Sequence, residues 1–482
     1  MIVGGNGKTY INYFSSVAVA RHLLDRGDTS KIRIILFIPD TILVHQFSQR
    51  YWDEVIDALK DPEFEVLNKL TREVYKDYMH EKGYIKDFIS DDNLEYESVW
   101  FMGMGNYRSN GLHIRFMRSD EDITFNLFKE ILRRVEHAEN IYIDISTGWN
   151  NYIPLLLEAI RIYIIYDKLK SMGSTDKHFY IINAEPNMKA EAISHIYIRK
   201  YDVKAVFRWP YGEGDSGKIR LNKFVESLDG VIRISEKDEG ALFSKIRRIM
   251  SNGKLVYNSI VYNTPLILYE DAFEGRHIID FDALRDVEEV LEEFIGIMWR
   301  RMRNVSYNDG NNIQVGPRYH INWDNISRLI LSLSIIEGIV KSLGLPLRDP
   351  YIEVKNMDKR FGDDDVSHTF VKILKLYENK MVGLNINKRF LQKEIIDIAA
   401  RINMLRDGEE KIYKELECRP TISRDNECKL LYTRYDPKRN FFAHSGLSKN
   451  YLLIRRDKNR LYLRYLKNKM EEIKSFVKNP EG

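Results

Sequence analysis

Hydrophobic and polar positions alternate with two different periods along the first half of the chain. Strand-like segments, rich in β-branched and aromatic residues, occur at residues 31–39, 98–103, 113–116, 140–146 and 177–183. Between them, residues 123–137 and 152–172 repeat apolar positions at helical spacing. Strands that alternate with helices predict an α/β domain with a parallel or mostly parallel sheet and helices on both faces.

The pattern changes at a glycine-rich stretch, residues 210–217. Residues 196–209, just before it, are rich in β-branched and aromatic residues without helical spacing and predict a terminal β-ribbon. Residues 218–265 have a mainly helical pattern. We therefore expect three parts, which are a first domain at 1–212, a helical connector at 213–265 and a second domain at 266–482.

The second domain is predicted to be mainly α-helical. Apolar residues recur at helical spacing in residues 280–302, 326–343, 368–382 and 389–405. The polar segment 308–317, which contains Asp309-Gly310-Asn311-Asn312, predicts an exposed loop.

Length and charge set broad limits. A chain of 482 residues is too long for one ordinary core, so two or three domains are expected. The 74 basic and 71 acidic residues give a net charge of only +3, which neither requires nor excludes a nucleic-acid partner. From Lys429 to the end, however, fourteen Lys and Arg residues stand against five Asp and Glu residues. This local surplus is where a phosphate backbone could dock.

Cysteine content and hydropathy indicate the cellular compartment in which the protein is expected. Cys418 and Cys428 are the only two cysteines, too few for a disulfide framework or a four-thiolate zinc site, and we expect no metal site. The longest apolar stretches, at residues 32–39 and 155–166, are short and interrupted by charges, so no membrane span is expected. No leader peptide is recognisable at the start. These features predict a cytoplasmic protein.

The segment 436–446 is the strongest candidate for catalysis. Asp436 suits a helix N-cap and Pro437 the first helical position, so a helix is expected to begin there. Gly446 would end or bend it. On such a helix Asn440 and His444 share a face, because they are four residues apart.

These residue types suit RNA cleavage. Attack by the RNA 2′-hydroxyl requires proton transfer, which histidine performs near neutral pH, and positive charge on the phosphate, which arginine supplies. Arg439 precedes His444 by five positions, and Asn440 could orient either one. A second Arg-x4-His match, from Arg108 to His113, lies in a turn before a strand and is attributed to chance. On local features alone, a structural role for His444 is the alternative.

A second candidate site follows the strand at residues 140–146. Backbone N–H groups of a Ser-Thr-Gly turn, with neighbouring Ser, Thr and Asn side chains, form a neutral cradle for phosphate or ribose at the carboxyl edge of an α/β sheet. An ordinary strand-to-helix turn is the alternative. The candidate residues are Ser146, Thr147, Gly148, Asn150 and Asn151.

The opening residues also contain a glycine-rich loop. A phosphate-binding P-loop reading fails because Ile2 stands where glycine is needed and hardly any strand can precede it. The loop could instead supply hydrogen-bond donors to phosphates, with lysine as the main charge. Its candidate residues are Asn6, Gly7, Lys8 and Thr9.

Both segments resemble parts of one protein family. Arg439-Asn440-x3-His444 resembles the Arg-polar-x3-His signature of HEPN ribonucleases. Residues 144–151 resemble the Asp-hydrophobic-Ser/Thr-x-Gly-x-Asn stretch of the CARF domain in the ribonucleases of type III CRISPR defence, although Thr147 stands where many members have histidine. The order of parts also resembles that family over almost the whole chain.

This resemblance implies a fold and an activity. The fold would be a Rossmann-like α/β CARF domain, a connector and a mainly α-helical HEPN domain. The activity would be metal-independent cleavage of single-stranded RNA, leaving a 2′,3′-cyclic phosphate, with Arg439, Asn440 and His444 as catalytic residues. The partners would be a second copy of the chain and an activating cyclic oligoadenylate, cyclic tetra-adenylate being favoured. The loop after the first strand would also line the ligand pocket.

Two other functions remain open. A non-catalytic cyclic-nucleotide sensor that recruits a partner would be favoured by loss of Arg439 or His444, but both are present. A HEPN ribonuclease toxin without ligand control is disfavoured by residues 144–151. No cofactor is expected. The ring size of the activator, the RNA sequence preference, degradation of the activator and assembly beyond a dimer are left open.

Overall fold

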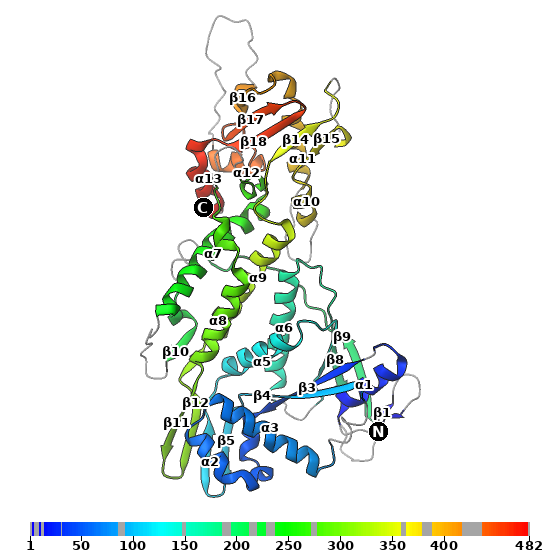
Figure 1. Cartoon of the computed structure of the whole chain (residues 1–482), viewed down its shortest axis with the longest axis vertical. Helices are drawn as coiled ribbons and strands as arrows, with labels where there is room; N and C mark the ends of the chain where they lie inside the picture. The colour runs from blue at the N-terminus through cyan, green and yellow to red at the C-terminus, as the bar shows by residue number, and fades with distance from the viewer. Residues whose placement is uncertain are drawn as a thin grey trace, which may run out of the picture.

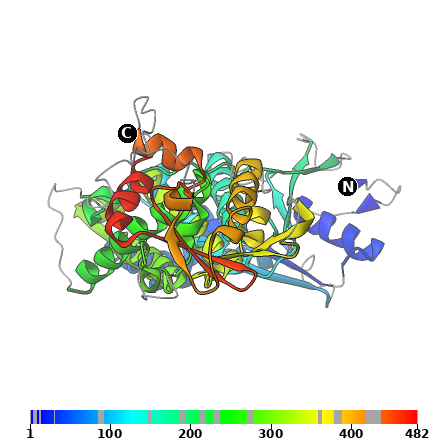
Figure 2. The same cartoon turned by 90° about the horizontal axis from the view of Figure 1, so that it is seen from above.

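The computed structural model describes thirteen segments of the chain, and the structural statements below concern them. They are residues 2–3, 9–10, 14–29, 31–84, 92–146, 151–185, 194–211, 219–227, 237–270, 277–357, 363–377, 388–416 and 436–480. The molecule is elongated, and long helices connect an N-terminal α/β region to a C-terminal α+β region (Figure 1). Seen from above, the N-terminus and the blue helix α1 lie to one side of the C-terminal region (Figure 2).

The strand positions predicted in the first half are confirmed. Two strands, β3 (Ile32–Pro39) and β4 (Leu94–Phe101), form a parallel pair. A separate five-stranded sheet has the order β2-β1-β9-β8-β7. Its strands are β1 (Ile2–Val3), β2 (Thr9–Tyr10), β7 (Asn140–Asp144), β8 (His178–Ala184) and β9 (Ser194–Lys200).

A single, mostly parallel sheet of the Rossmann type is not confirmed. Within the five-stranded sheet, β7–β8 and β1–β9 are parallel, whereas β8–β9 and β1–β2 are antiparallel. The predicted ribbon at 196–209 is confirmed only as far as the end of β9 at Lys200. Antiparallel pairing of β9 was not expected, because strand direction depends on the path of the connecting segments and not on the residues of the strand itself.

The N-terminal helices cover these strands. The predicted helices at 123–137 and 152–172 are confirmed as α5 and α6. A capping box between Ser119 and Asp122 begins α5. The rings of Tyr163 on α6 and Phe179 on β8 pack 6.1 Å apart. The helices are α1 (Ser15–Arg26), α2 (Trp52–Lys60), α3 (Phe64–Glu81), α5 (Asp120–Arg134) and α6 (Ile153–Lys170).

The predicted exposed loop at 308–317 is wrong. These residues form most of an antiparallel hairpin, in which β11 (Asn304–Asp309) pairs with β12 (Asn312–Pro317). Strand β12 in turn pairs in parallel with β6 (Leu112–Phe116), which pairs with β5 (Gly105–Ser109). Ile313 and Val315 are buried. The polar residues belong only to the tight turn, and the partner strand lies about 200 residues earlier in the sequence.

A buried ion pair fixes this hairpin to the first half. Arg118 binds both carboxylate oxygens of Asp40, at 3.0 and 2.9 Å, and both side chains are fully buried. Its guanidinium also donates to Oδ1 of Asn304, the first residue of β11, at 3.3 Å. Burial raises the pKa of Asp40, whereas the charge of Arg118 lowers it. Removing Arg118 would leave a buried carboxylate without its cation.

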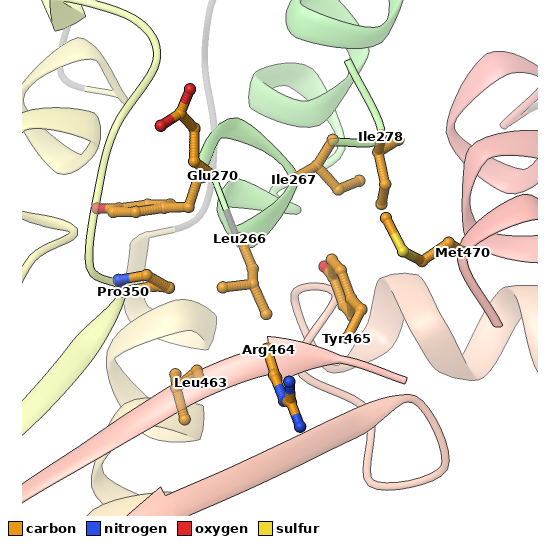
Figure 3. Close-up of a pocket in the computed structure, with 10 residues that line it drawn as sticks. Leu266, Ile267, Glu270, Ile278, Pro350, Leu463, Arg464, Tyr465 and Met470 are labelled. Atoms are coloured by element: carbon orange, nitrogen blue, oxygen red, sulfur yellow. The ribbon is translucent and has the colours of Figure 1, made fainter. Parts of the chain in front are cut away.

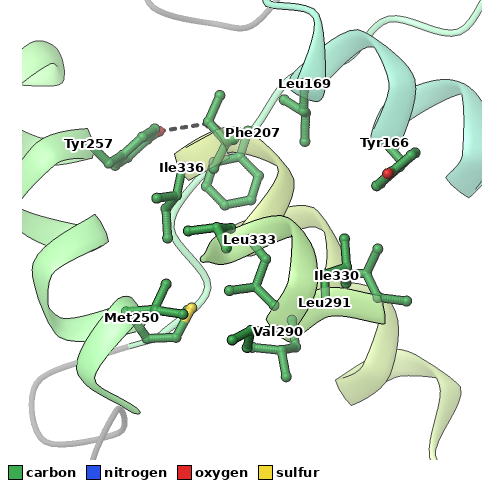
Figure 4. Packing of buried hydrophobic residues seen from close by; sticks show 14 of the residues in the cluster. Tyr166, Leu169, Phe207, Met250, Tyr257, Val290, Leu291, Ile330, Leu333 and Ile336 are labelled. Carbon is green, nitrogen blue, oxygen red and sulfur yellow. Dashed lines mark hydrogen bonds between the residues drawn. The ribbon is translucent and has the colours of Figure 1, made fainter. Parts of the chain in front are cut away.

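Three long helices connect the two regions, α7 (Lys237–Val261), α8 (Val287–Arg301) and α9 (Trp323–Leu343). Figure 4 shows Met250 of α7, Val290 of α8 and Leu333 of α9 packed together. A Cβ atom on Gly253 would lie 2.1 Å from Cδ1 of Ile336, so glycine at this position leaves room for the Ile336 side chain between α7 and α9. The helical pattern predicted for residues 218–265 is confirmed for α7, whereas residues 225–227 form a short strand, β10 (Val225–Ser227).

The C-terminal region combines helices with a sheet. The predicted helices at 280–302, 326–343 and 389–405 are confirmed as α8, α9 and α11. The helix predicted at 368–382 is confirmed for residues 371–377, while 378–382 lie outside the described residues. A mainly helical domain is not confirmed. An antiparallel sheet has the order β15-β14-β18-β17-β16. Its strands are β14 (Tyr351–Val354), β15 (Val366–His368), β16 (Glu410–Ile412), β17 (Leu452–Asp457) and β18 (Arg460–Tyr465), and its helices are α10 (Val371–Tyr377), α11 (Lys388–Ala399), α12 (Pro437–Ala443) and α13 (Met470–Lys478).

A hydrophobic core extends from the N-terminal region through the connecting helices into the C-terminal region. Movement at either end therefore acts on packed side chains. In the described part of the chain, no helix has the length and apolar character that crossing a membrane requires.

Candidate active site

The helix that carries the predicted catalytic residues forms as the sequence indicates. The Asp436 side chain accepts a hydrogen bond from the Arg439 N–H at 3.0 Å, and Pro437 is the first helical residue of α12. The backbone N–H of His444 still bonds to the Asn440 carbonyl at 3.2 Å, but His444 itself caps the helix. Catalytic candidates therefore lie along and at the end of one short, capped helix.

The end of α12 is fixed by a glycine. Gly446 has φ +73°, and a Cβ atom there would lie 2.9 Å from the Tyr465 hydroxyl and 3.0 Å from Thr264. Ser445, which is buried, accepts a hydrogen bond from the Asn263 amide just after α7, at 2.7 Å. The chain that follows His444 is thereby tied to the end of α7 and to β18.

Helix α12 buries one aromatic residue and leaves its polar residues at least partly exposed. Phe441 is fully buried and packs against Tyr451 and Phe476, at 5.5 and 5.8 Å between ring centroids. Arg439 is exposed, and Asn440 and His444 are partly exposed. The apolar contact anchors the helix while the predicted catalytic side chains keep access to solvent.

A glutamate that the sequence analysis missed contacts the candidate histidine. Nδ1 of His444 lies 3.0 Å from Oε1 of Glu394 on α11. Glu394 is only 9% exposed. A signal was present, because Glu394 occupies a core position of α11 together with Leu391 and Ile395. A charged residue at such a position calls for a specific partner.

The two other catalytic candidates differ in their contacts. Nδ2 of Asn440 donates to Oγ of Ser448 at 3.3 Å, which restrains its amide. Within the described part of the chain, the Arg439 side chain makes no hydrogen bond or ion pair. An exposed guanidinium of this kind is available to bind two phosphate oxygens. Helix α12 and its C-cap therefore bring together an arginine and a histidine, residue types that suit phosphate binding and proton transfer.

The second candidate site lies where β7 ends. The Ser146 N–H bonds to Oδ1 of Asp144 at 2.9 Å, and the Ser146 hydroxyl accepts the Ala184 N–H at 2.7 Å. Oδ2 of Asp144 accepts the Ser15 hydroxyl at the start of α1, at 2.5 Å. Asn151, exposed, begins the next described segment. Ser146 thus holds the strand ends together, while Thr147, Gly148 and Asn150 lie outside the described residues.

The start of α6 connects this turn to other strand ends. Tyr152 exchanges hydrogen bonds with the Met104 backbone, at 3.0 and 3.2 Å, and its ring packs 5.1 Å from Phe101 at the end of β4. Burial raises the pKa of Tyr152. Tyr152, the N-cap of α6, is therefore at the carboxyl end of β4, the edge where α/β domains bind ligands.

Of the four candidate residues near the amino terminus, only Thr9 lies within the described residues. Asn6, Gly7 and Lys8 lie outside the described residues, and Thr9 pairs with Val3 in the β1–β2 hairpin. Three strands separate β2 from β7 in the sheet order, about 19 Å at the usual spacing between strands. Within one chain the sheet does not bring Thr9 beside Ser146.

A small pocket lies between the residues that follow α7 and strand β18. Figure 3 shows Leu266 and Tyr465 facing each other, with Met470 turned toward Ile278. Arg464, on its rim, is paired with Glu410. The mostly apolar walls of this pocket do not suit a phosphate ligand. In the described residues, no group of three His, Cys, Asp or Glu side chains is arranged to hold a metal ion.

Two family models match the chain. Residues 3–186 match the CARF domain of the CRISPR system endoribonuclease Csx1, and residues 384–469 match its HEPN domain. The two matches cover more than half of the chain, and the second contains Glu394 and all of α12. No curated protein matches the chain. The chain therefore belongs to the CARF–HEPN endoribonucleases of CRISPR systems.

Proposed function

We propose that this chain cleaves single-stranded RNA at α12 and is switched on by a cyclic oligoadenylate bound at its CARF domain. The observation that supports this most is the arrangement of α12 inside the HEPN match. Its arginine is exposed, and its histidine is anchored by Glu394 while remaining partly open to solvent. These are the two groups that phosphodiester transfer needs.

The proposed reaction is attack of the RNA 2′-hydroxyl on the neighbouring phosphorus. His444 accepts the hydroxyl proton, Arg439 binds the phosphate oxygens, and Asn440, held by Ser448, orients the reacting groups. The products are a 2′,3′-cyclic phosphate and a 5′-hydroxyl end. These residues supply proton transfer and positive charge, so the proposed reaction requires no added metal ion or cofactor.

The proposed activator is a cyclic oligoadenylate held by the turn at residues 146–151. Support comes from the CARF match and from Ser146 and Tyr152, which lie near the ends of β7 and β4. We favour the four-adenylate ring, because an even-numbered ring presents the same groups to two copies of the chain. The working form is then a homodimer in the cytoplasm, with one HEPN motif from each copy.

Product analysis tests the chemistry. A labelled single-stranded RNA is incubated with protein and cyclic tetra-adenylate, with and without EDTA. We expect equal cleavage in both, a 5′-hydroxyl end that a kinase can phosphorylate, and a 3′ end that blocks ligation until the cyclic phosphate is opened and the phosphate is removed. Loss of cleavage in EDTA, restored by adding a divalent metal, would contradict the proposed reaction.

A further inference from the structure

One nearly buried carboxylate is not explained by packing. Glu394 lies on α11 between Leu391 and Ile398, which are both fully buried. Within the described residues, its side chain has one hydrogen-bond partner, Nδ1 of His444 at 3.0 Å. Neither lysine nor arginine neutralises it there.

This arrangement costs stability. A carboxylate removed from water loses hydration, and a leucine at the same position would fit the apolar stripe of α11 without that cost. The hydrogen bond to a partly exposed histidine offsets only part of the loss. A role in orienting His444 gives a physical reason for glutamate at this position.

We propose that Glu394 is a positioning residue for RNA cleavage. It accepts the Nδ1–H of His444, so that the neutral ring carries its proton on Nδ1 and presents the lone pair of Nε2 to RNA. This inference rests on the proposed function and adds which nitrogen reacts and what holds it.

The same contact assists the chemical step. The proton of the 2′-hydroxyl passes to Nε2, the bond from the 2′-oxygen to phosphorus forms, and the bond from phosphorus to the 5′-oxygen breaks. The leaving 5′-oxygen takes up a proton from water. His444 is then an imidazolium, and the Glu394 carboxylate stabilises its charge at short range.

Glu394→Gln separates this role from packing. Glutamine has the same shape, but it lacks the charge and its NH₂ group can face Nδ1 and favour the wrong tautomer. We expect kcat to fall by about 100-fold while KM for RNA is unchanged. Glu394→Asp, which keeps the charge, should retain more activity than Glu394→Gln. Wild-type kcat in Glu394→Gln, or a change in KM alone, would overturn the proposal.

A matched control lies on the same helix. Asp397 is exposed, and within the described residues it makes no hydrogen bond or ion pair with His444. Asp397→Asn removes the same charge from α11 and should leave kcat and KM at wild-type values. An equal loss in Asp397→Asn and Glu394→Gln would show that only the net charge of the helix matters and would refute the positioning role.

A stability cycle tests the contact without RNA or activator. In His444→Ala the carboxylate of Glu394 loses its partner, so adding Glu394→Gln should raise Tm in that background and should not raise it in the wild type. Equal shifts in both backgrounds would show that the two side chains are not coupled. This result stands even if the wild type cleaves no RNA, so failure of the proposed function and failure of this inference are distinguishable.

Discussion

Gly338 of α9 lies directly against the end of α6, and a Cβ atom on it would be 2.2 Å from the carbonyl oxygen of Leu169. Lys170, which follows Leu169 in α6, pairs with Glu288 of α8 at 2.7 Å and with Glu337 of α9 at 3.4 Å. Helix α6 begins just after the predicted ligand turn. A shift at the end of α6 would therefore act on α8 and α9, two of the three helices that lead toward the C-terminal region.

A substitution at Gly338 tests this packing. Gly338→Ala should lower the free energy of unfolding by about 1–3 kcal/mol, because the added methyl group must displace backbone. Gly296 in α8 is a matched control, since its Cβ would meet nothing closer than 3.7 Å. Gly296→Ala should be neutral or stabilising by up to about 1 kcal/mol. Equal effects in chemical denaturation would contradict the close contact.

The ion pairs at the same junction predict a pH dependence of stability. Hydrogen bonds from Lys170 and then Lys341 lower the pKa of Glu288 to about 2 from 4.5. Because the folded pKa is the lower one, the contribution is present above pH 4.5 and is lost as pH falls toward 2.

Comparison of variants measures this effect. The difference in Tm between wild type and Glu288→Gln should be largest at neutral pH and should shrink between pH 4.5 and 2. Glu288 is about half exposed, so added salt should also reduce the difference. Exposed Glu289 on the same helix is the control. A Tm difference that is constant with pH would argue against these pairs.

The three predicted catalytic residues should differ in how much RNA cleavage is lost when each is replaced by alanine. His444→Ala and Arg439→Ala should each nearly abolish RNA cleavage, because they remove proton transfer and phosphate binding, while circular dichroism shows a folded protein. Asn440→Ala should reduce cleavage less. Full activity in either purified His444→Ala or Arg439→Ala would remove α12 as the active site.

Substitutions at the predicted ligand site should change ligand affinity, whereas substitution of His444 should change turnover. Asn150→Ala should raise the concentration of cyclic tetra-adenylate needed for activation, and saturating ligand should restore much of the rate. Lys8→Ala should act in the same way if its loop belongs to the site. His444→Ala should keep wild-type affinity in calorimetry but lose turnover. Unchanged affinity in both Asn150→Ala and Lys8→Ala would place the ligand elsewhere.

Local patterns predicted the elements better than their pairing. The cap at Asp436 and the start at Pro437 depend on neighbouring residues only, and both are confirmed. The β11–β12 hairpin was missed because its polar turn dominates the segment and its partner, β6, is distant in sequence. Strand directions in the N-terminal sheet also depend on distant segments.

The candidate site shows the same division. Residue types and spacing predicted Arg439, Asn440 and His444 as catalytic candidates, but they did not predict the contact between His444 and Glu394, which are 50 residues apart. The amide of Asn440 is held by a nearby serine, Ser448, that no motif marked. Spacing on one helix predicts which side chains share a face, whereas partners on other elements depend on tertiary packing.

The most direct measurement is cleavage of a labelled single-stranded RNA with and without a panel of cyclic oligoadenylates. We predict little cleavage without ligand, strong activation of the wild type by the four-adenylate ring, and none in His444→Ala at any ligand concentration. Activation by a six-adenylate ring alone would revise only the ring size. Ligand-independent cleavage, or no cleavage by the wild type with any ring, would contradict the central claim.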